Sequence, residues 1–180
     1  MLQLTFTMSL DLSNLETGEL IEAYGDCIAL LKERNVIRTN NVVGDLGEYL
    51  VMEQYKKDTT LPNLTPAATG TKNVDAIGRN GKLYSIKTTT GSVTGVIYGL
   101  HTPDENVPDE KMFDYLVICR LDRNYRLKAI YQLDWCAFIR HKKWHSRMRA
   151  WNVCVSRDVI ADSQVIYESG DEDFNQTKLI

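Results

Sequence analysis

The chain has 180 residues, of which 43% are apolar and 25% charged, so it can bury one sizeable hydrophobic core and is expected to form a single domain over residues 1–180. A net charge of -3 excludes a uniformly basic nucleic-acid coat. No stretch reaches the roughly 20 apolar residues of a membrane span, and the N-terminus lacks the order of a secretory signal, so a cytoplasmic protein is expected.

The first predicted element is an amphipathic helix over residues 17–34, in an N-terminal helical region of about 12–40. Thr17 can cap the helix. Its apolar residues recur at helical spacing, namely Leu20, Tyr24, Cys27, Ile28 and Leu31. We interpret this helix as part of the scaffold.

A second helix is predicted from about Asn41 to Tyr55. Its apolar face consists of Val43, Leu46, Leu50 and Val51. Gly47 lies on that same face, where the lack of a side chain indicates close approach to a sheet. A loop follows over residues 58–72, which are rich in Thr, Pro and Gly.

Two strands, residues 73–78 and 82–88, are then predicted around a turn that contains Asn80 and Gly81. A two-residue turn would direct Asp75 into the core and bury an unpaired carboxylate, at a cost of several kcal/mol. A three-residue turn over residues 79–81 instead pairs Asp75 with Ser85. We predict the three-residue turn, because Asp75, Ser85 and Lys87 then converge on one face. Val74, Ala76, Tyr84 and Ile86 form the opposite, apolar face.

The rest of the chain predicts a mixed sheet with short helices. Strands are expected at 93–98, at the continuously apolar 115–119, and at its hairpin partner 125–131. Asp134 can cap a helix to about residue 140, and Ser156 a helix to about 162. Residues 164–167 can add an edge strand, and about 168–180 form a loose acidic tail. The predicted fold class is α/β, a mixed central sheet flanked by helices.

A carboxylate beside a lysine, with a second carboxylate near, suits phosphodiester hydrolysis. A hard cation such as Mg2+ takes oxygen ligands and acidifies bound water, and a lysine can orient that water and offset developing negative charge. Asp75 and Lys87 supply the pair. Glu48 supplies the second carboxylate, since it lies at the edge of the packed face of its helix.

These residues resemble the PD-(D/E)XK nuclease superfamily, which includes many type II restriction endonucleases, over about residues 41–135. Glu48 follows a G-x-x-G sequence, Asp75 comes on the next strand, and Ser85-Ile86-Lys87 on the strand after. The resemblance implies a restriction-endonuclease-like fold, with Mg2+ held by Glu48, Asp75 and the carbonyl of Ile86. It also implies that Lys87 lies at the attacking water, with Ser85 as an accessory hydrogen-bonding group.

The sequence departs from this superfamily at Ser85, where members usually have Glu or Asp. A hydroxyl is a poor substitute for a metal-bound carboxylate. In similar nucleases a neighbouring element supplies the acid; Glu48 is the best local candidate, and Asp104 and Glu105 are more remote ones. The other outcome is an inactive relative.

Nucleic-acid contacts are expected in two places. Thr88 and Thr89 are candidates to bind phosphate, although they also suit a strand end and turn. Residues 111–150 hold ten Lys or Arg against three Asp or Glu. Within them, cations and aromatic residues alternate in a predicted DNA-binding stretch whose members are Arg140, Lys142, Lys143, Trp144, Arg147 and Arg149. The alternative is a solvated loop anchored by its tryptophans.

The sequence therefore predicts a magnesium-dependent endodeoxyribonuclease that acts on double-stranded DNA, of the type II restriction kind and active as a homodimer. Two other interpretations stay open. One is a catalytically impaired DNA-binding or assembly module with the same fold, which Ser85 favours. The other is a structural domain that binds no nucleic acid.

Overall fold

The computed structural model describes residues 11–68, 70–105 and 107–170. Its contacts divide the chain into two compact units, Met1–Asn40 and Asn41–Ile180, which we describe separately. The division falls at the end of the N-terminal helical region expected at about 12–40. No helix in the described ranges is both long enough and apolar enough to cross a membrane.

The first unit contains the helix α1 (Thr17–Glu33). Its N-cap is Glu16 and not Thr17 as predicted, and the Glu16 N–H donates to Glu19 Oε2 at 2.8 Å. No residue of α1 is buried within the part of the chain that the structure describes.

The second unit is built on a six-stranded sheet of order β1-β2-β3-β4-β5-β8, in which β3 and β4 are parallel and the other neighbours antiparallel. The predicted mixed α/β class is confirmed to this extent. The strands of this sheet are β1 (Leu64–Pro66), β2 (Ala76–Gly78), β3 (Leu83–Thr89), β4 (Tyr115–Leu121), β5 (Leu127–Asp134) and β8 (Gln164–Glu168). The remaining elements are α2 (Val42–Lys57), α3 (Trp135–His141), α4 (Arg157–Ala161) and a separate hairpin of β6 (Lys142–His145) with β7 (Ala150–Val153).

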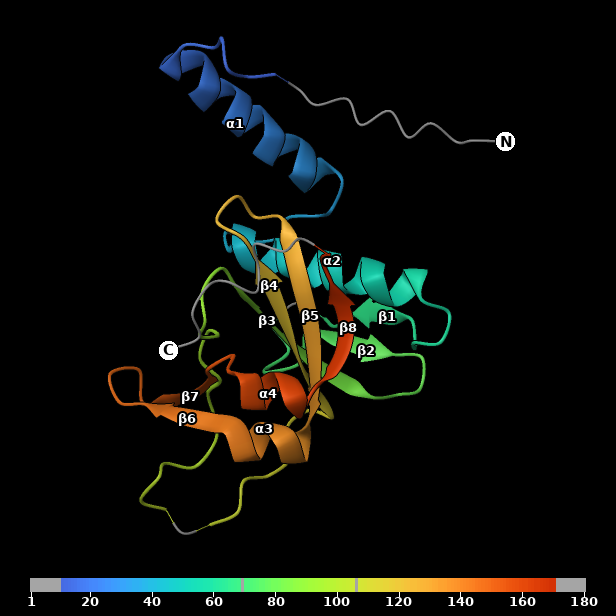
Figure 1. Ribbon diagram of the computed structural model, residues 1–180, viewed down its shortest axis with the longest axis vertical. Helices are drawn as coiled ribbons and strands as arrows, with labels where there is room; N and C mark the ends of the chain where they lie inside the picture. The colour runs from blue at the N-terminus through green and yellow to red at the C-terminus, as the bar shows by residue number, and fades with distance from the viewer. Residues whose placement is uncertain (1–10, 69, 106, 171–180) are drawn as a thin grey trace. The chain divides into compact units, whose positions relative to one another are not determined.

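Both faces of the main sheet are covered, as Figure 1 shows. On one face, α2 contributes Val51 and Tyr55 to a core cluster with side chains of β2 to β5. On the other face, a second cluster joins β4 and β5 to α3, β7 and α4. The sheet is therefore the middle layer of three, and a side chain of β3 faces one cluster or the other by its position in the strand.

Capping residues and local sequence patterns predicted most of the helices and strands correctly. Asp134 caps α3 by accepting from the Ala137 N–H at 2.7 Å, and Ser156 caps α4 by accepting from the Val159 N–H at 3.4 Å. The predicted edge strand is confirmed as β8, which ends at Glu168. The part of the expected acidic tail over 171–180 lies outside the described residues.

Two further expectations were wrong. Residues 93–98 form no strand of the main sheet. This segment makes two isolated bridges, from Val93 to Cys154 and from Ile97 to Trp151 of β7, and Gly95 lies between them. The predicted loop over 58–72 contains β1, which pairs with β2. Its three residues are too few for a periodic pattern to reveal them.

Candidate active site

The hairpin between β2 and β3 has the predicted turn over residues 79–81. The last residue of the turn, a glycine, has a φ of 76°, which glycine adopts at no steric cost. The Gly78 N–H donates to the carbonyl of Lys82 at 2.9 Å, which closes the turn. The register that follows places Asp75 opposite Ser85, so the three-residue turn is confirmed.

Asp75 lies where β2 begins, and its carboxylate bonds to β3. Its backbone N–H donates to Tyr84 at 2.8 Å, while Oδ2 accepts the N–H of Ile86 at 2.6 Å and the hydroxyl of Ser85 at 3.4 Å. The carboxylate thus replaces a partner strand for Ile86, because the pairing of β2 and β3 stops before this residue. All of these side-chain bonds reach Oδ2, so Oδ1 accepts none from the described residues.

Lys87 completes the cluster. Its Nζ lies 3.6 Å from Asp75 Oδ2, and the two side chains are 20% and 22% exposed. Ser85 is fully buried beside them. The convergence of Asp75, Ser85 and Lys87 on one face is therefore confirmed. Asp75 and Lys87 form an ion pair that is partly shielded from water but still accessible to solvent.

The opposite face of this hairpin is apolar, as predicted, with Val74, Ala76, Tyr84 and Ile86 all buried. Three of these residues belong to the cluster that α2 covers. Since side chains alternate along β3, Lys87 and Ser85 face away from α2.

At the other end, the start of β3 is held by Asp114. Its carboxylate accepts the Leu83 N–H at 2.9 Å and pairs with Lys82 at 3.2 Å and Lys111 at 2.7 Å. Burial alone would raise the pKa of Asp114, but these hydrogen bonds outweigh it and lower the pKa to about 2. The first residue of β3 is therefore anchored independently of Asp75.

Gly47 brings α2 into direct contact with β3. A Cβ at this position would lie 1.8 Å from Thr88 Oγ1, so only glycine fits. The close approach predicted from the sequence is confirmed. Glu48 follows on α2 and is half-buried. Thr88 faces α2 whereas Lys87 faces away, so Glu48 would have to reach around the open edge of β3 to meet Asp75.

The candidate ligand atoms are oxygens, which Mg2+ prefers. The described residues contain no group of three or more His, Cys, Asp or Glu side chains that could hold a metal ion. Mg2+ commonly uses one or two carboxylates and keeps several waters. Among the described residues no hydrogen bond reaches Asp75 Oδ1, and Glu48 would be the second carboxylate. The carbonyl of Ile86 points to the same strand edge as its N–H, which is the edge that Asp75 occupies.

Thr88 and Thr89 do not fit the DNA-binding role predicted for them. Thr88 Oγ1 is buried against Gly47 and has no hydrogen-bond partner among the described residues. Thr89 is 8% exposed, and its hydroxyl donates to the Val93 carbonyl at 2.8 Å and accepts from the Gly91 N–H at 3.0 Å. Both hydroxyls pack the end of β3, which is the alternative that the sequence left open.

The basic stretch runs from the end of α3, which holds Arg140, into the hairpin β6–β7. The prediction of Lys142 as a DNA contact is wrong. The Lys142 ammonium bonds to Asp109 and lies 3.9 Å from the ring centroid of Trp151. Its side chain is 12% exposed. Trp144 packs edge-on against Trp151 at 5.2 Å between ring centroids. The tryptophans thus anchor the hairpin, as the alternative interpretation expected of a loop.

Other cations of this stretch do face solvent. Lys143, Arg147 and Arg149 are exposed. Arg140 is 58% exposed and pairs with Asp162 at 3.0 Å. Near the hairpin tip a pocket of about 370 Å³ is lined by Thr102, Pro103, Asp104, Trp144, Ser146 and Arg149. Four of the six residues predicted to bind DNA in the basic stretch are therefore exposed cations, and Trp144 lines a pocket beside them.

Sequence reasoning missed the carboxylates that neutralise part of the basic stretch. Asp109 lies 33 residues from Lys142 in the chain, and Asp162 lies 22 residues from Arg140. Asp162 also bonds to His141 Nε2 at 2.7 Å, and the bonds from His141 and Arg140 lower the pKa of Asp162. No local pattern signals such distant pairs.

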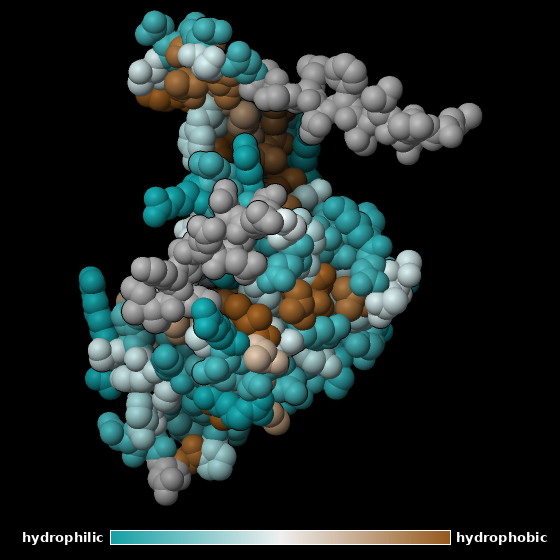
Figure 2. Space-filling view, viewed as in Figure 1, coloured by the Kyte–Doolittle hydropathy of each residue, from teal (hydrophilic) through white to brown (hydrophobic). Residues whose placement is uncertain are grey.

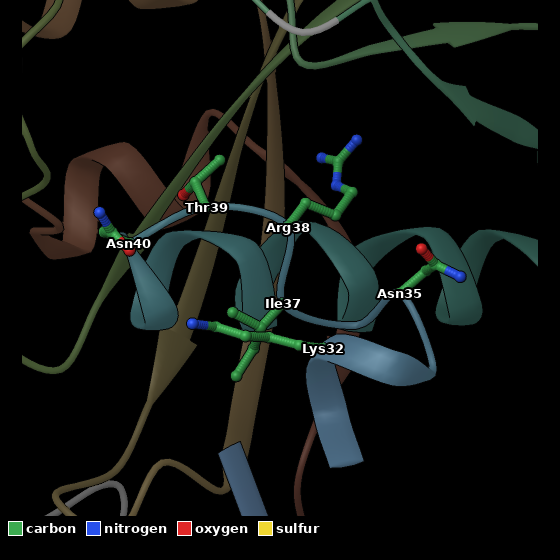
Figure 3. Close-up of a pocket in the computed structure, with 6 residues that line it drawn as sticks. All are labelled: Lys32, Asn35, Ile37, Arg38, Thr39 and Asn40. Atoms are coloured by element: carbon green, nitrogen blue, oxygen red, sulfur yellow. The ribbon is translucent and has the colours of Figure 1, made fainter. Parts of the chain in front are cut away.

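A further pocket, of about 620 Å³, lies in the first unit and is lined by Lys32, Asn35, Ile37, Arg38, Thr39 and Asn40. Figure 3 shows the side chains of Lys32 and Arg38 extending in different directions. The lining contains no carboxylate, so this pocket offers no ligand pair for Mg2+.

The cluster of Asp75, Ser85 and Lys87 on β2 and β3 is thus the best-formed chemical site in the described chain. The sequence matches no known family model and no curated protein.

Proposed function

We propose that this protein is a magnesium-dependent endodeoxyribonuclease of the type II restriction kind, with a PD-(D/E)XK-like site. The observation that carries the proposal is the pair of Asp75 and Lys87, 3.6 Å apart and about one-fifth exposed, at the open edge of β3. A buried structural ion pair would exclude water, and a surface pair would be fully solvated. The Asp75–Lys87 pair is shielded enough from water for its electrostatic interactions to be strong, and exposed enough for a substrate to contact it.

Each side chain has a distinct part in hydrolysis. Lys87 can donate to an attacking water and to the phosphate oxygens, where negative charge develops in the transition state. Asp75 Oδ2 holds the ammonium in place, and Ser85 and the Ile86 N–H hold Oδ2. Asp75 Oδ1, Glu48 and the Ile86 carbonyl would hold Mg2+, which supplies charge neutralisation and a more acidic bound water.

The substrate side is supported by the hairpin β6–β7. Its exposed cations Lys143, Arg147 and Arg149 suit the phosphates of double-stranded DNA in a protein whose overall charge is negative. A nuclease that cuts both strands needs two sites, so the proposal includes a homodimer.

The test is plasmid cleavage with Mg2+ by the parent and by Asp75→Asn, Lys87→Gln and Glu48→Gln. We expect each change to lower the cleavage rate by about 100-fold or more, the usual effect of losing one such group. Lys56→Ala is the matched control, since Lys56 forms a 3.7 Å pair with Glu53 on the solvated side of α2. Circular dichroism checks that each variant is folded.

A parent without cleavage, or one unaffected by changes at Asp75 and Lys87, contradicts the nuclease. Ser85 favours a second candidate, a DNA-binding or assembly module that has lost catalysis, because a buried hydroxyl stands where an acidic ligand is usual in the superfamily. DNA binding by a parent that cleaves nothing would support this second candidate.

A further inference from the structure

The helix α1 carries an apolar surface that no residue described in the first unit covers. Within α1, Ile21 is 67% exposed, Tyr24 65%, Leu30 49% and Leu20 40%. Figure 2 shows apolar side chains gathered along this helix. A lone helix of 17 residues is marginal in water, and the two glycines of α1 weaken it further. A partner that covers the apolar surface would therefore stabilise α1.

The apolar residues of α1 have the spacing of a coiled-coil seam. Leu20, Tyr24, Cys27 and Leu31 follow one another at intervals of four, three and four residues, as positions a and d of a heptad do. Ile21 and Ile28 flank this seam on one side. We define the seam as Leu20, Tyr24, Cys27 and Leu31. Such a pattern fits another helix and not a flat surface.

The charges of α1 select both the partner and its direction. Residues 16–26 hold four carboxylates and no cation, whereas residues 27–34 hold two cations, Lys32 and Arg34, and one carboxylate, Glu33. A second copy packed antiparallel would set each acidic half against the basic end of the other. A parallel copy would set the carboxylates against one another.

Helical geometry refines this match. Glu16 and Arg34 are 18 residues apart, which is five full turns, so they lie on the same flank of the seam. In an antiparallel pair, Glu16 of one copy faces Arg34 of the other, twice by symmetry. Leu20 then meets Leu31 of the second copy, and Tyr24 meets its Cys27.

We propose that α1 is a dimerisation helix that pairs antiparallel with α1 of a second copy of this chain. The contact is isologous, so it closes at two copies and forms no filament. The proposal does not depend on nuclease activity. If both hold, the dimer supplies the two sites that cleavage of both strands requires.

The test is the mass of the full chain, whose monomer is 20.5 kDa, by sedimentation over a range of concentrations. We expect a dimer for the parent, and a dissociation constant raised by about 100-fold or more in Tyr24→Asp, which buries a charge in the seam. Ala29→Asp is the matched control, because Ala29 is exposed on the opposite side of the helix. It should dimerise like the parent.

Charge variants test the direction. Glu16→Arg and Arg34→Glu should each weaken the dimer about tenfold, and mixing the two variants should restore it, since both facing pairs become attractive. A monomeric parent overturns the proposal, whatever else covers the seam. A dimer that Tyr24→Asp leaves intact overturns the role of α1, and single charge variants without effect overturn the antiparallel pairing. The mass readout is independent of DNA cleavage, so failure here leaves the nuclease standing.

Discussion

Gly47 is the residue through which α2 reaches the strand of the candidate site. The helix is held against Thr88, the neighbour of Lys87, by the absence of a side chain. This contact sets how far Glu48 stands from the open edge of β3. A glycine in a helix costs about 1 kcal/mol relative to alanine, and here the close approach explains it.

We expect Gly47→Ala to lower the free energy of unfolding by about 1 to 3 kcal/mol, although alanine is the better helix former. The new Cβ would overlap Thr88, whose branched side chain in a buried strand end cannot move aside cheaply. Urea denaturation followed by circular dichroism measures the effect. Adding Thr88→Ala should recover most of the loss. A destabilisation that the second change leaves untouched would place its cause elsewhere.

At the scale of elements, the hairpin β6–β7 separates two kinds of cation. Lys142 is bonded to Asp109 under Trp151, where it holds the hairpin to the protein. Lys143, Arg147 and Arg149 project into solvent. The basic stretch thus contains cations with a structural role and cations exposed to solvent. Only the exposed cations can bind DNA phosphates and release their counterions.

Replacing Lys143, Arg147 and Arg149 together by alanine should weaken duplex DNA binding and flatten its salt dependence. If each cation contacts one phosphate, the slope of log K against log salt falls by about 3, since each contributes about 0.9. Fluorescence anisotropy in EDTA between 50 and 200 mM salt covers the range in which such contacts change affinity strongly.

The control for this experiment is a variant with the same loss of charge, in which the exposed Lys56, Lys57 and Arg123 become alanine. It should keep the slope of the parent. Equal effects of the two triple variants would point to general electrostatics instead of a hairpin contact. DNA binding that is undetectable in the parent would favour a structural domain.

At the scale of the whole molecule, both core clusters are made from the second unit alone. Their buried residues run from Val51 to Val159, on the two faces of the main sheet. None of them belongs to α1, which has no buried residue within the described chain. The stability of the second unit should therefore be independent of α1.

Deleting residues 1–34 removes α1 but keeps the buried Val36 and Ile37. Urea denaturation should then show a free energy of unfolding changed by no more than a surface substitution typically changes it, about 0.5 kcal/mol. The comparison belongs at low protein concentration, where association adds nothing to stability. The same deletion should abolish the proposed dimer. A truncated chain that fails to fold would show that α1 contributes to the core after all.

Local chemistry in the sequence determined most of the elements and the core of the site. The caps of α3 and α4, the turn over residues 79–81 and the face shared by Asp75 and Lys87 follow from interactions between near neighbours. These interactions span a turn or one hairpin, so composition and periodicity in a short window are enough to predict them.

Only the tertiary structure decided which of these residues are available. It buried the hydroxyls of Thr88 and Thr89, neutralised Lys142 with a carboxylate 33 residues away, and left Glu48 on the α2 side of β3. Each outcome depends on packing between segments distant in the chain, and no local pattern encodes which distant groups will meet.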